Sequence, residues 1–155
     1  MSKSIATISW RRDDQAFTDN QYERAHQWRF EGGISVPASS SPDIIPVPLS
    51  DPTAVDPEEA FVASISSCHM LWFLSIAAKR SFIVDEYNDR AEGRMELNDG
   101  GCMAITEVFL RPVVTYEISA APSPEENVAI HRNAHEQCFI ANSVRSAIQI
   151  APTMR

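Results

Sequence analysis

The sequence predicts an α+β fold, in which antiparallel strands pack around one long buried central helix and a second helix. The segment 60–78 is apolar over the length of a long helix and is framed by helix start and stop signals. Short patterns typical of strands stand on both sides of it, and a second helix start follows them. The length of 155 residues fits one domain, so we predict a single domain over residues 1–155.

The N-terminal third predicts two short strands and a long connection. Residues 5–10 and 26–30 have the alternating or aromatic patterns of strands, and the polar segment 11–23 separates them. Residues 32–56 are rich in proline and serine, which excludes a helix there. We expect this stretch to be a surface connection.

The central helix has clear signals at both ends. Asp56 is a capping residue, Pro57 suits the first helical position, and Glu58 and Glu59 suit the positive end of the helix dipole. Two cations at 79–80 suit the other end. Apolar side chains run nearly all the way round the helix, so we expect burial on most sides. Several serines interrupt it, which favours a buried helix over a membrane span.

The C-terminal part predicts a hairpin, a helix and a last strand. Residues 83–97 and 104–118 have strand patterns, and the turn residues 98–101 join them. A serine, a proline and two glutamates open a second helix over 123–141. Residues 146–150 predict the final strand.

Composition excludes several classes of partner. Thirteen basic and 21 acidic residues give a formal charge of −8, which repels nucleic acid and anionic membrane surfaces. The first residues form no apolar signal segment, and three cysteines do not make a secreted disulfide framework. We therefore expect a soluble cytoplasmic protein with reduced thiols. No phosphate-binding glycine loop or dinucleotide fingerprint is present, so no cofactor is expected. A Ser-His-Asp site stays open, although the sequence contains no nucleophile elbow.

Two cysteines are candidates for redox chemistry. Cys68 lies on the central helix and Cys138 on the second, so only tertiary packing can bring them together. If it does, one thiolate attacks the O–O bond of a peroxide, becomes a sulfenic acid and is captured by the other thiol. Capture requires α-carbons within roughly 4.4–6.8 Å of each other. Taken singly, each is more simply a small buried hydrophobe, and Cys102 is expected to be an incidental exposed thiol.

A reactive thiolate is stabilised by a nearby cation, for which arginine is the best candidate because it does not deprotonate. Arg24, Arg11 and Arg12 are the candidates. Glu58 can hold such a guanidinium through a two-pronged salt bridge. The plainer interpretations are a helix-end charge for Glu58 and a solvated surface residue for Arg24.

Helix geometry limits which thiol Glu58 can serve. Glu58 precedes Cys68 by ten residues, which is roughly 15 Å of rise along a straight helix. A Glu58 that works at a thiol therefore belongs to the site of another subunit. This predicts a symmetric homodimer with composite sites.

A zinc site is a competing interpretation. His131, His135 and Cys138 share one face of the second helix, and His69 adjoins Cys68. Pairs of histidines four residues apart are common on exposed helices, and no metalloprotease pattern is present. We therefore expect no metal, and the roles of the histidines stay open.

Two cysteine segments resemble those of a known family. Residues 56–70 are similar to the first cysteine motif of the OsmC/Ohr family, the osmotically inducible protein C-like and organic hydroperoxide resistance proteins. Residues 135–144 resemble its second cysteine segment, and 87–93 and 108–112 resemble the strands between them. The resemblance extends from about Trp10 to the end of the chain.

This resemblance implies a thiol-dependent peroxidase that protects against oxidative stress by reducing organic hydroperoxides. Cys68 would attack the peroxide, Cys138 would resolve the product as a disulfide, and Glu58 would orient the activating arginine. Arg24 is the expected arginine, with Arg11 and Arg12 as alternatives. The implied partners are a small hydroperoxide, a thiol reductant and a second copy of the chain in an intertwined homodimer.

The alternative from another class is a non-catalytic protein of the same fold. Cys68 would then lie in a closed apolar pocket that binds a small hydrophobic ligand.

Overall fold

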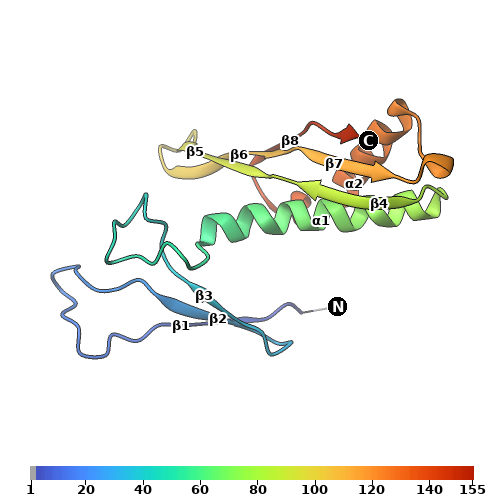
Figure 1. The fold of residues 1–155 in the computed structure, drawn as a ribbon. Helices are drawn as coiled ribbons and strands as arrows, with labels where there is room; N and C mark the ends of the chain where they lie inside the picture. The colour runs from blue at the N-terminus through green and yellow to red at the C-terminus, as the bar shows by residue number, and fades with distance from the viewer. Residues whose placement is uncertain (1–2) are drawn as a thin grey trace. The chain divides into compact units, whose positions relative to one another are not determined.

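The computed structural model describes residues 3–155, which fall into two compact units with a boundary between Ala60 and Phe61 (Figure 1). Helix α1, Pro57–Lys79, is continuous across this boundary. The single domain expected over residues 1–155 stays a prediction.

The N-terminal unit contains one antiparallel sheet with the strand order β1-β2-β3. The strands predicted at 5–10 and 26–30 are confirmed as β1, Ala6–Ser9, and β2, His26–Phe30. Describing all of 32–56 as a surface connection was wrong, because it contains β3, Ser35–Ala38. Gly33 adopts a φ of +85°, and its N–H donates to the carbonyl of Phe30 at 3.0 Å, so the chain turns back and pairs with β2.

Helix α1 begins and ends where the sequence predicts. The N–H of Glu59 donates to Asp56 Oδ1 at 2.7 Å, and the N–H of Asp56 donates to Glu59 Oε2 at 3.4 Å. These two contacts form a capping box that satisfies free amide groups at the helix start. Lys79 is the last helical residue.

The burial expected around most of α1 is not found. Its buried residues form a single stripe of Ile65, His69, Phe73 and Ala77, whereas Leu71 on the other side is 61% exposed. The two core clusters of the C-terminal unit lie on the face of α1 that carries this stripe. By length and a mean hydropathy of 1.6 alone, α1 would be able to cross a membrane, but its buried stripe forms the core of the C-terminal unit.

Both long strands of the hairpin predicted from 83–97 and 104–118 are interrupted, and the resulting strands belong to two sheets. Asp89 Oδ1 accepts the N–H of Arg111 at 2.7 Å at the point where both long strands break. The turn at 98–101 is confirmed, with the N–H of Asn98 donating to the carbonyl of Cys102 at 2.9 Å. The resulting strands are β4, Val84–Asp89; β5, Glu92–Leu97; β6, Met103–Leu110; and β7, Pro112–Tyr116.

The C-terminal segment adds α2 and two strands. The serine predicted to cap the second helix, Ser123, forms a capping box with Glu126 and opens α2, Pro124–Gln137, which ends earlier than the expected 141. The last strand is confirmed as β8, Ala147–Ile150, and a short β9, Thr153–Met154, follows it. β8 pairs with β6 and β9 pairs with β7 in parallel, whereas the other strand pairs are antiparallel, as predicted. The sheet orders are β4-β7-β9 and β5-β6-β8. Short 3-10 turns lie at Ile118–Ala120 and Ala141–Ser143.

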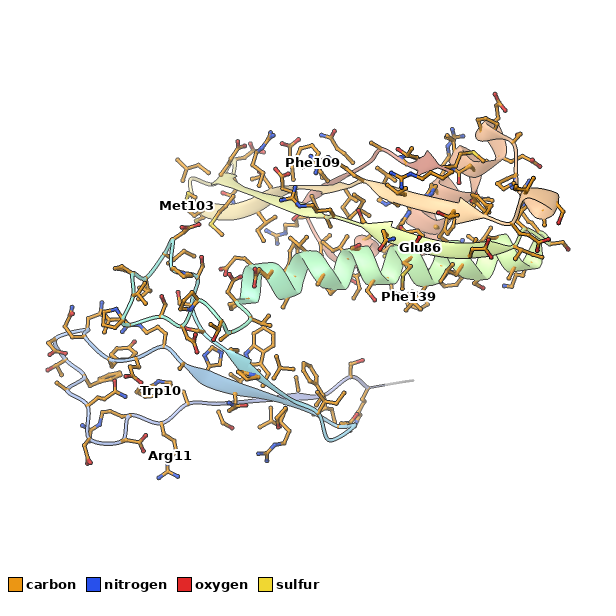
Figure 2. The ribbon with its side chains drawn as sticks, in the orientation of Figure 1. Trp10, Arg11, Glu86, Met103, Phe109 and Phe139 are labelled. Atoms are coloured by element: carbon orange, nitrogen blue, oxygen red, sulfur yellow. The ribbon has the colours of Figure 1, made fainter. Side chains whose placement is uncertain are left out.

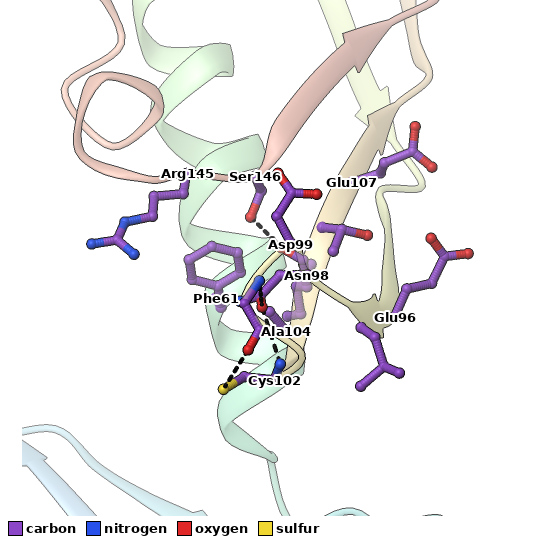
Figure 3. A pocket seen from close by; sticks show the side chains of 13 residues that line it. Phe61, Glu96, Asn98, Asp99, Cys102, Ala104, Glu107, Arg145 and Ser146 are labelled. Atoms are coloured by element: carbon purple, nitrogen blue, oxygen red, sulfur yellow. Dashed lines mark hydrogen bonds between the residues drawn. The ribbon is translucent and has the colours of Figure 1, made fainter.

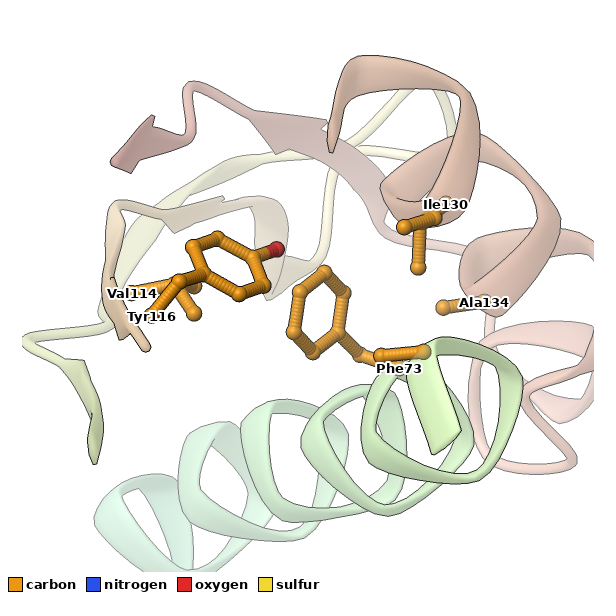
Figure 4. Packing of buried hydrophobic residues seen from close by; sticks show 6 residues of the cluster. Phe73, Val114, Tyr116, Ile130 and Ala134 are labelled. Carbon is orange, nitrogen blue, oxygen red and sulfur yellow. The ribbon is translucent and has the colours of Figure 1, made fainter. Parts of the chain in front are cut away.

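The main core lies where α1, α2 and β7 meet. Phe73 points from α1 toward Ile130 and Ala134 of α2 and toward Val114 and Tyr116 of β7 (Figure 4). A second cluster joins α1 to β6 through Ile65, Val108 and Leu110. These two clusters fix α1 along the sheets, and with it the position of Cys68.

Candidate functional site

The two candidate cysteines lie together between α1 and the end of α2. Cys68 is half-buried on α1, and Cys138 is fully buried. The sequence predicted Cys138 inside the second helix. It is instead the C-terminal capping residue of α2, with φ −66° and ψ 113°. The two side chains are neighbours, since Cys68 is among the groups that raise the pKa of Cys138. The structure thus brings together the two sulfur atoms that the sequence separates by 70 positions.

Burial raises the pKa of the Cys138 thiol to about 11, and the neighbouring Cys68 acts in the same direction. The N–H of Ala141 donates to Cys138 Sγ at 3.3 Å and opposes the shift. Cys138 is consequently a neutral thiol near pH 7.

The turn after α2 is held by side-chain contacts. The amide of Asn142 donates to the carbonyls of Cys138 and Glu136, each at 3.0 Å. Phe139 is 70% exposed, and its ring meets that of Trp72 edge-on with centroids 5.5 Å apart (Figure 2). Cys138 is therefore placed by a braced turn.

Glu58 and Arg24 line one pocket of about 550 Å³ within the N-terminal unit. Its walls also include Trp10, Phe17 and Tyr22, whose rings pack on one another with centroids 4.8–5.9 Å apart. The pocket therefore has an aromatic wall and two residues of opposite charge. Sequence reasoning missed the aromatic wall, although three aromatic residues within an otherwise polar segment were a usable signal.

The salt bridge expected between Arg24 and Glu58 is not formed; in the described part of the chain, the four ion pairs present join other residues. The Arg24 guanidinium lies 3.8 Å from the ring centroid of Tyr22 and donates to the carbonyl of Tyr22. It also donates to Asn20 Oδ1 at 2.9 Å and to the carbonyl of Asn20 at 3.2 Å. These local acceptors occupy the donors that Glu58 was expected to engage.

The other two candidate arginines face elsewhere. Arg11 is exposed and lies 3.6 Å from Asp13 (Figure 2), and Arg12 donates to the carbonyl of Gln15 at 2.7 Å. Neither lines the pocket that contains Glu58. Arg24 is the only one of the three that does.

Cys102 is an exposed thiol in the hairpin turn, as predicted. It is exposed at the rim of a pocket of about 1070 Å³ that Phe61 and Arg145 also line (Figure 3). Its sulfur is 4.0 Å from the carbonyl of Gly100, in the hairpin turn.

The zinc interpretation lacks a ligand set, because no three His, Cys, Asp or Glu residues within 3–155 are grouped to hold a metal ion. Instead, His69 Nε2 and His131 Nδ1 share a hydrogen bond of 2.9 Å in the core. Burial lowers the pKa of His69 to about 4, with a further effect of His135. Burial also lowers the pKa of His131 to about 3, with a further effect of His69.

Comparison with known proteins gives consistent results. An OsmC-like protein of unknown function from Vibrio cholerae O1 biovar El Tor is 50% identical, with a TM-score of 0.96, over 98% of this chain and 99% of its own. An organic hydroperoxide resistance protein from Elizabethkingia anophelis shares 16% identity at a TM-score of 0.72, over 99% and 96% of the two chains. OhrB of Bacillus subtilis shares 13% identity at a TM-score of 0.63, over 99% and 98%. These last two show a common fold. No protein with a curated description matches.

The model of the OsmC-like protein family matches residues 50–153, which contain both cysteines of the pair and most of the chain. The α+β fold and the family resemblance predicted from the two cysteine segments are both confirmed. This chain belongs to the OsmC-like family.

Proposed function

We propose that this chain is a cysteine-based hydroperoxide reductase that defends the cell against organic hydroperoxides. Membership of the OsmC-like family supports this role, and so does the fold shared with organic hydroperoxide resistance proteins. The observation that carries the proposal is that a buried, neutral Cys138 and a half-buried Cys68 are neighbours.

The reaction has three steps, each balanced in atoms and electrons. The Cys68 thiolate attacks the outer oxygen of ROOH, the O–O bond breaks, and RO⁻ takes up a proton to leave as an alcohol. The Cys138 sulfur attacks the resulting Cys68 sulfenic acid, forming the disulfide and releasing water. An external thiol reductant then returns both cysteines to thiols by exchange and is itself oxidised to a disulfide.

The surroundings of the two sulfurs support this division of roles. Only a thiolate attacks a peroxide efficiently, and Cys138, with its pKa of about 11, is protonated near pH 7. Cys138 is also fully buried, whereas Cys68 is partly accessible. Cys68 is therefore the attacking thiol and Cys138 the resolving one. A cytoplasmic location fits this cycle, because thiol reductants are maintained there.

Thiol counting tests the reaction directly. One equivalent of cumene hydroperoxide should remove two thiols per chain within seconds in the wild type and in Cys102→Ser, the matched control for an unrelated cysteine. Cys68→Ser should lose no thiol rapidly. Cys138→Ser should stop at a sulfenic acid that dimedone traps. Rapid thiol loss in Cys68→Ser would contradict the assignment.

The aromatic pocket favours one alternative, the binding of a small hydrophobic ligand without catalysis. The same experiment separates the two functions. A binding protein would lose thiols slowly and equally in all four proteins, and calorimetry would detect the same apolar ligand affinity in Cys68→Ser as in the wild type.

We further propose that the working form is a homodimer in which Glu58 and Arg24 of one chain serve Cys68 of the other. Because α1 is an uninterrupted helix from Pro57, Glu58 stays roughly 15 Å from Cys68 of its own chain. The exposed Leu71 side of α1 supplies apolar surface for a second copy. Arg24 would exchange its present acceptors for Glu58 when the site is completed.

Complementation tests the composite site. Cys68→Ser and Glu58→Ala dimers are each expected to be inactive, and they are mixed after mild denaturation and refolding. With random pairing, half of the dimers are mixed and one of their two sites is intact, so activity should return to about one quarter of wild type. Sites built within single chains would show no recovery. Sedimentation of the mixture gives the oligomeric state independently.

A further inference from the structure

The seam between α1 and α2 contains a polar contact in the middle of the core. His69 of α1 is 1% exposed and His131 of α2 is 2% exposed, and their rings lie nearly parallel at 8°. Within residues 3–155, their 2.9 Å bond is the only side-chain hydrogen bond that joins the two helices. Just beyond the C-terminal end of α1, Arg80 donates to Glu126 of α2 at 3.0 Å on the surface, so the histidine bond is the buried polar contact between the two helices.

Each imidazole of the pair depends on the other for its hydrogen bonding. Both rings are neutral near pH 7 because burial lowers their pKa values. A neutral imidazole has one N–H and one free lone pair, so a single N–H···N bond is possible between the facing nitrogens. His69 Nδ1 and His131 Nε2 have no protein partner among the described residues. Breaking the bond would therefore leave two further buried polar atoms without partners.

Neighbouring rings restrict the direction in which the bond can form. Phe73 stacks on His131 with centroids 4.2 Å apart and an interplanar angle of 23°. Phe73 itself is fully buried in the main core between the helices (Figure 4). The His131 ring therefore cannot swing to follow a displaced His69. The bond forms in one register of α1 against α2.

The same two segments hold the thiols. His69 follows Cys68 directly, and His131 precedes Cys138 by seven residues, which is about two helical turns. A disulfide tolerates an α-carbon separation of only roughly 4.4–6.8 Å. A slide of α1 by one turn, about 5.4 Å, would take the sulfurs out of range.

We propose that the His69–His131 bond is a positioning contact that fixes the register of α1 against α2, so that Cys68 and Cys138 stay within disulfide range. This role rests on the thiol pair of the proposed function. Neither histidine touches the substrate. The contact acts by raising the effective concentration of one thiol at the other.

Amide side chains of two lengths provide matched variants. Glutamine places its amide near the Nε2 position and asparagine near the Nδ1 position. His69→Gln and His131→Asn therefore keep a polar atom at the bonding position, whereas His69→Asn and His131→Gln have the same chemistry at the wrong length. Arg80→Ala is the control for a surface contact between the same segments, since Arg80 bonds Glu126 at 3.0 Å in solvent.

The readout is the effective concentration of the Cys68–Cys138 thiol pair. Each protein is oxidised with diamide and equilibrated with glutathione buffers, and the disulfide fraction is measured by mass spectrometry at a temperature where circular dichroism shows a folded chain. We expect His69→Gln, His131→Asn and Arg80→Ala to stay within about threefold of wild type. His69→Asn and His131→Gln should fall about tenfold or more.

A purely structural role would lower the melting temperatures and leave the glutathione equilibrium of the folded chain unchanged, which would overturn the proposal. The reverse ranking of the amide variants would also overturn it. A wild-type chain that forms no Cys68–Cys138 disulfide under diamide would refute the proposed peroxidase cycle as well. If the wild type forms the disulfide and all variants have the same effective concentration, the positioning role is refuted and the peroxidase cycle is not.

Discussion

Gly93 is the position at which adding a single methyl group should disturb the fold most clearly. A Cβ built on Gly93 would lie 2.7 Å from Val62 Cγ2 and 3.3 Å from Ile105 Cγ2. Val62 is on α1 and Ile105 is on β6, so the new methyl would be wedged between the helix and the sheet. Valine has one strongly preferred rotamer in a helix and cannot turn aside at low cost.

We expect Gly93→Ala to lower the free energy of unfolding by about 1–3 kcal/mol, as overpacking at a tight contact between two elements does. In a domain of this size, each kcal/mol corresponds to roughly 2–4 °C in Tm. The change is measured by thermal unfolding followed by circular dichroism. All proteins are compared at one concentration, because association shifts Tm. Gly32→Ala is the matched control, because its Cβ would meet no atom within 4 Å.

The double variant Val62→Ala with Gly93→Ala tests the stated cause. Val62→Ala alone leaves a small cavity and costs stability, but in the double variant the new methyl fills part of that space. The double variant should therefore lose less stability than the sum of the two single losses, by at least about 0.5 kcal/mol. Additive effects, or a Gly93→Ala protein as stable as Gly32→Ala, would refute the packing explanation.

Three further outcomes follow from the structure. Tyr116→Phe removes the Oη–H that donates to buried Asn127 Oδ1 at 2.7 Å, so unfolding should become easier by about 1–3 kcal/mol, whereas the half-buried Tyr22→Phe should change little. His69 and His131 have pKa values of about 4 and about 3 in the folded chain, against about 6.5 in the unfolded chain. The unfolded chain therefore binds more protons in acid, and Tm should fall as the pH drops from about 6.5 towards 3. A His69→Phe/His131→Phe variant whose Tm falls with the same slope would contradict this. Arg24→Ala should slow peroxide consumption about tenfold or more and move the alkylation of Cys68 to higher pH, while Arg11→Ala should match the wild type in both assays.

Local signals predicted the helices well because their causes are local. The caps at Asp56 and Ser123 act within three residues of the chain, and the structure contains both capping boxes. The break at Arg111 in the strand predicted over 104–118 was missed, although Pro112 restricts the backbone of the residue before it. The long alternating pattern of this segment favoured one continuous strand. The parallel pairing of β8 and β9 depends on where the end of the chain returns, and no local pattern encodes that.

The candidate site was predictable to the extent that it depends on residue chemistry. The thiol pair followed from two cysteine segments, but the capping position of Cys138 did not, because apolar periodicity continues beyond the true end of α2. The partners of Arg24 were misjudged for a different reason. Asn20 and Tyr22 are close in sequence and satisfy the guanidinium without a long-range contact, whereas a bridge to Glu58 requires the pocket to close.

The difference in exposure between the two thiols has a chemical consequence in the proposed cycle. A resolving thiol that ionised readily and met solvent would be oxidised by peroxide independently of its partner. Burial and the neighbouring Cys68 keep Cys138 protonated, so it stays unreactive until a sulfenic acid forms beside it. The departing hydroxide of that sulfenic acid is then the base at hand, and the Cys138 proton leaves with it as water. Cys138 would thus be activated by the product of the first step, which couples disulfide formation to peroxide reduction at Cys68.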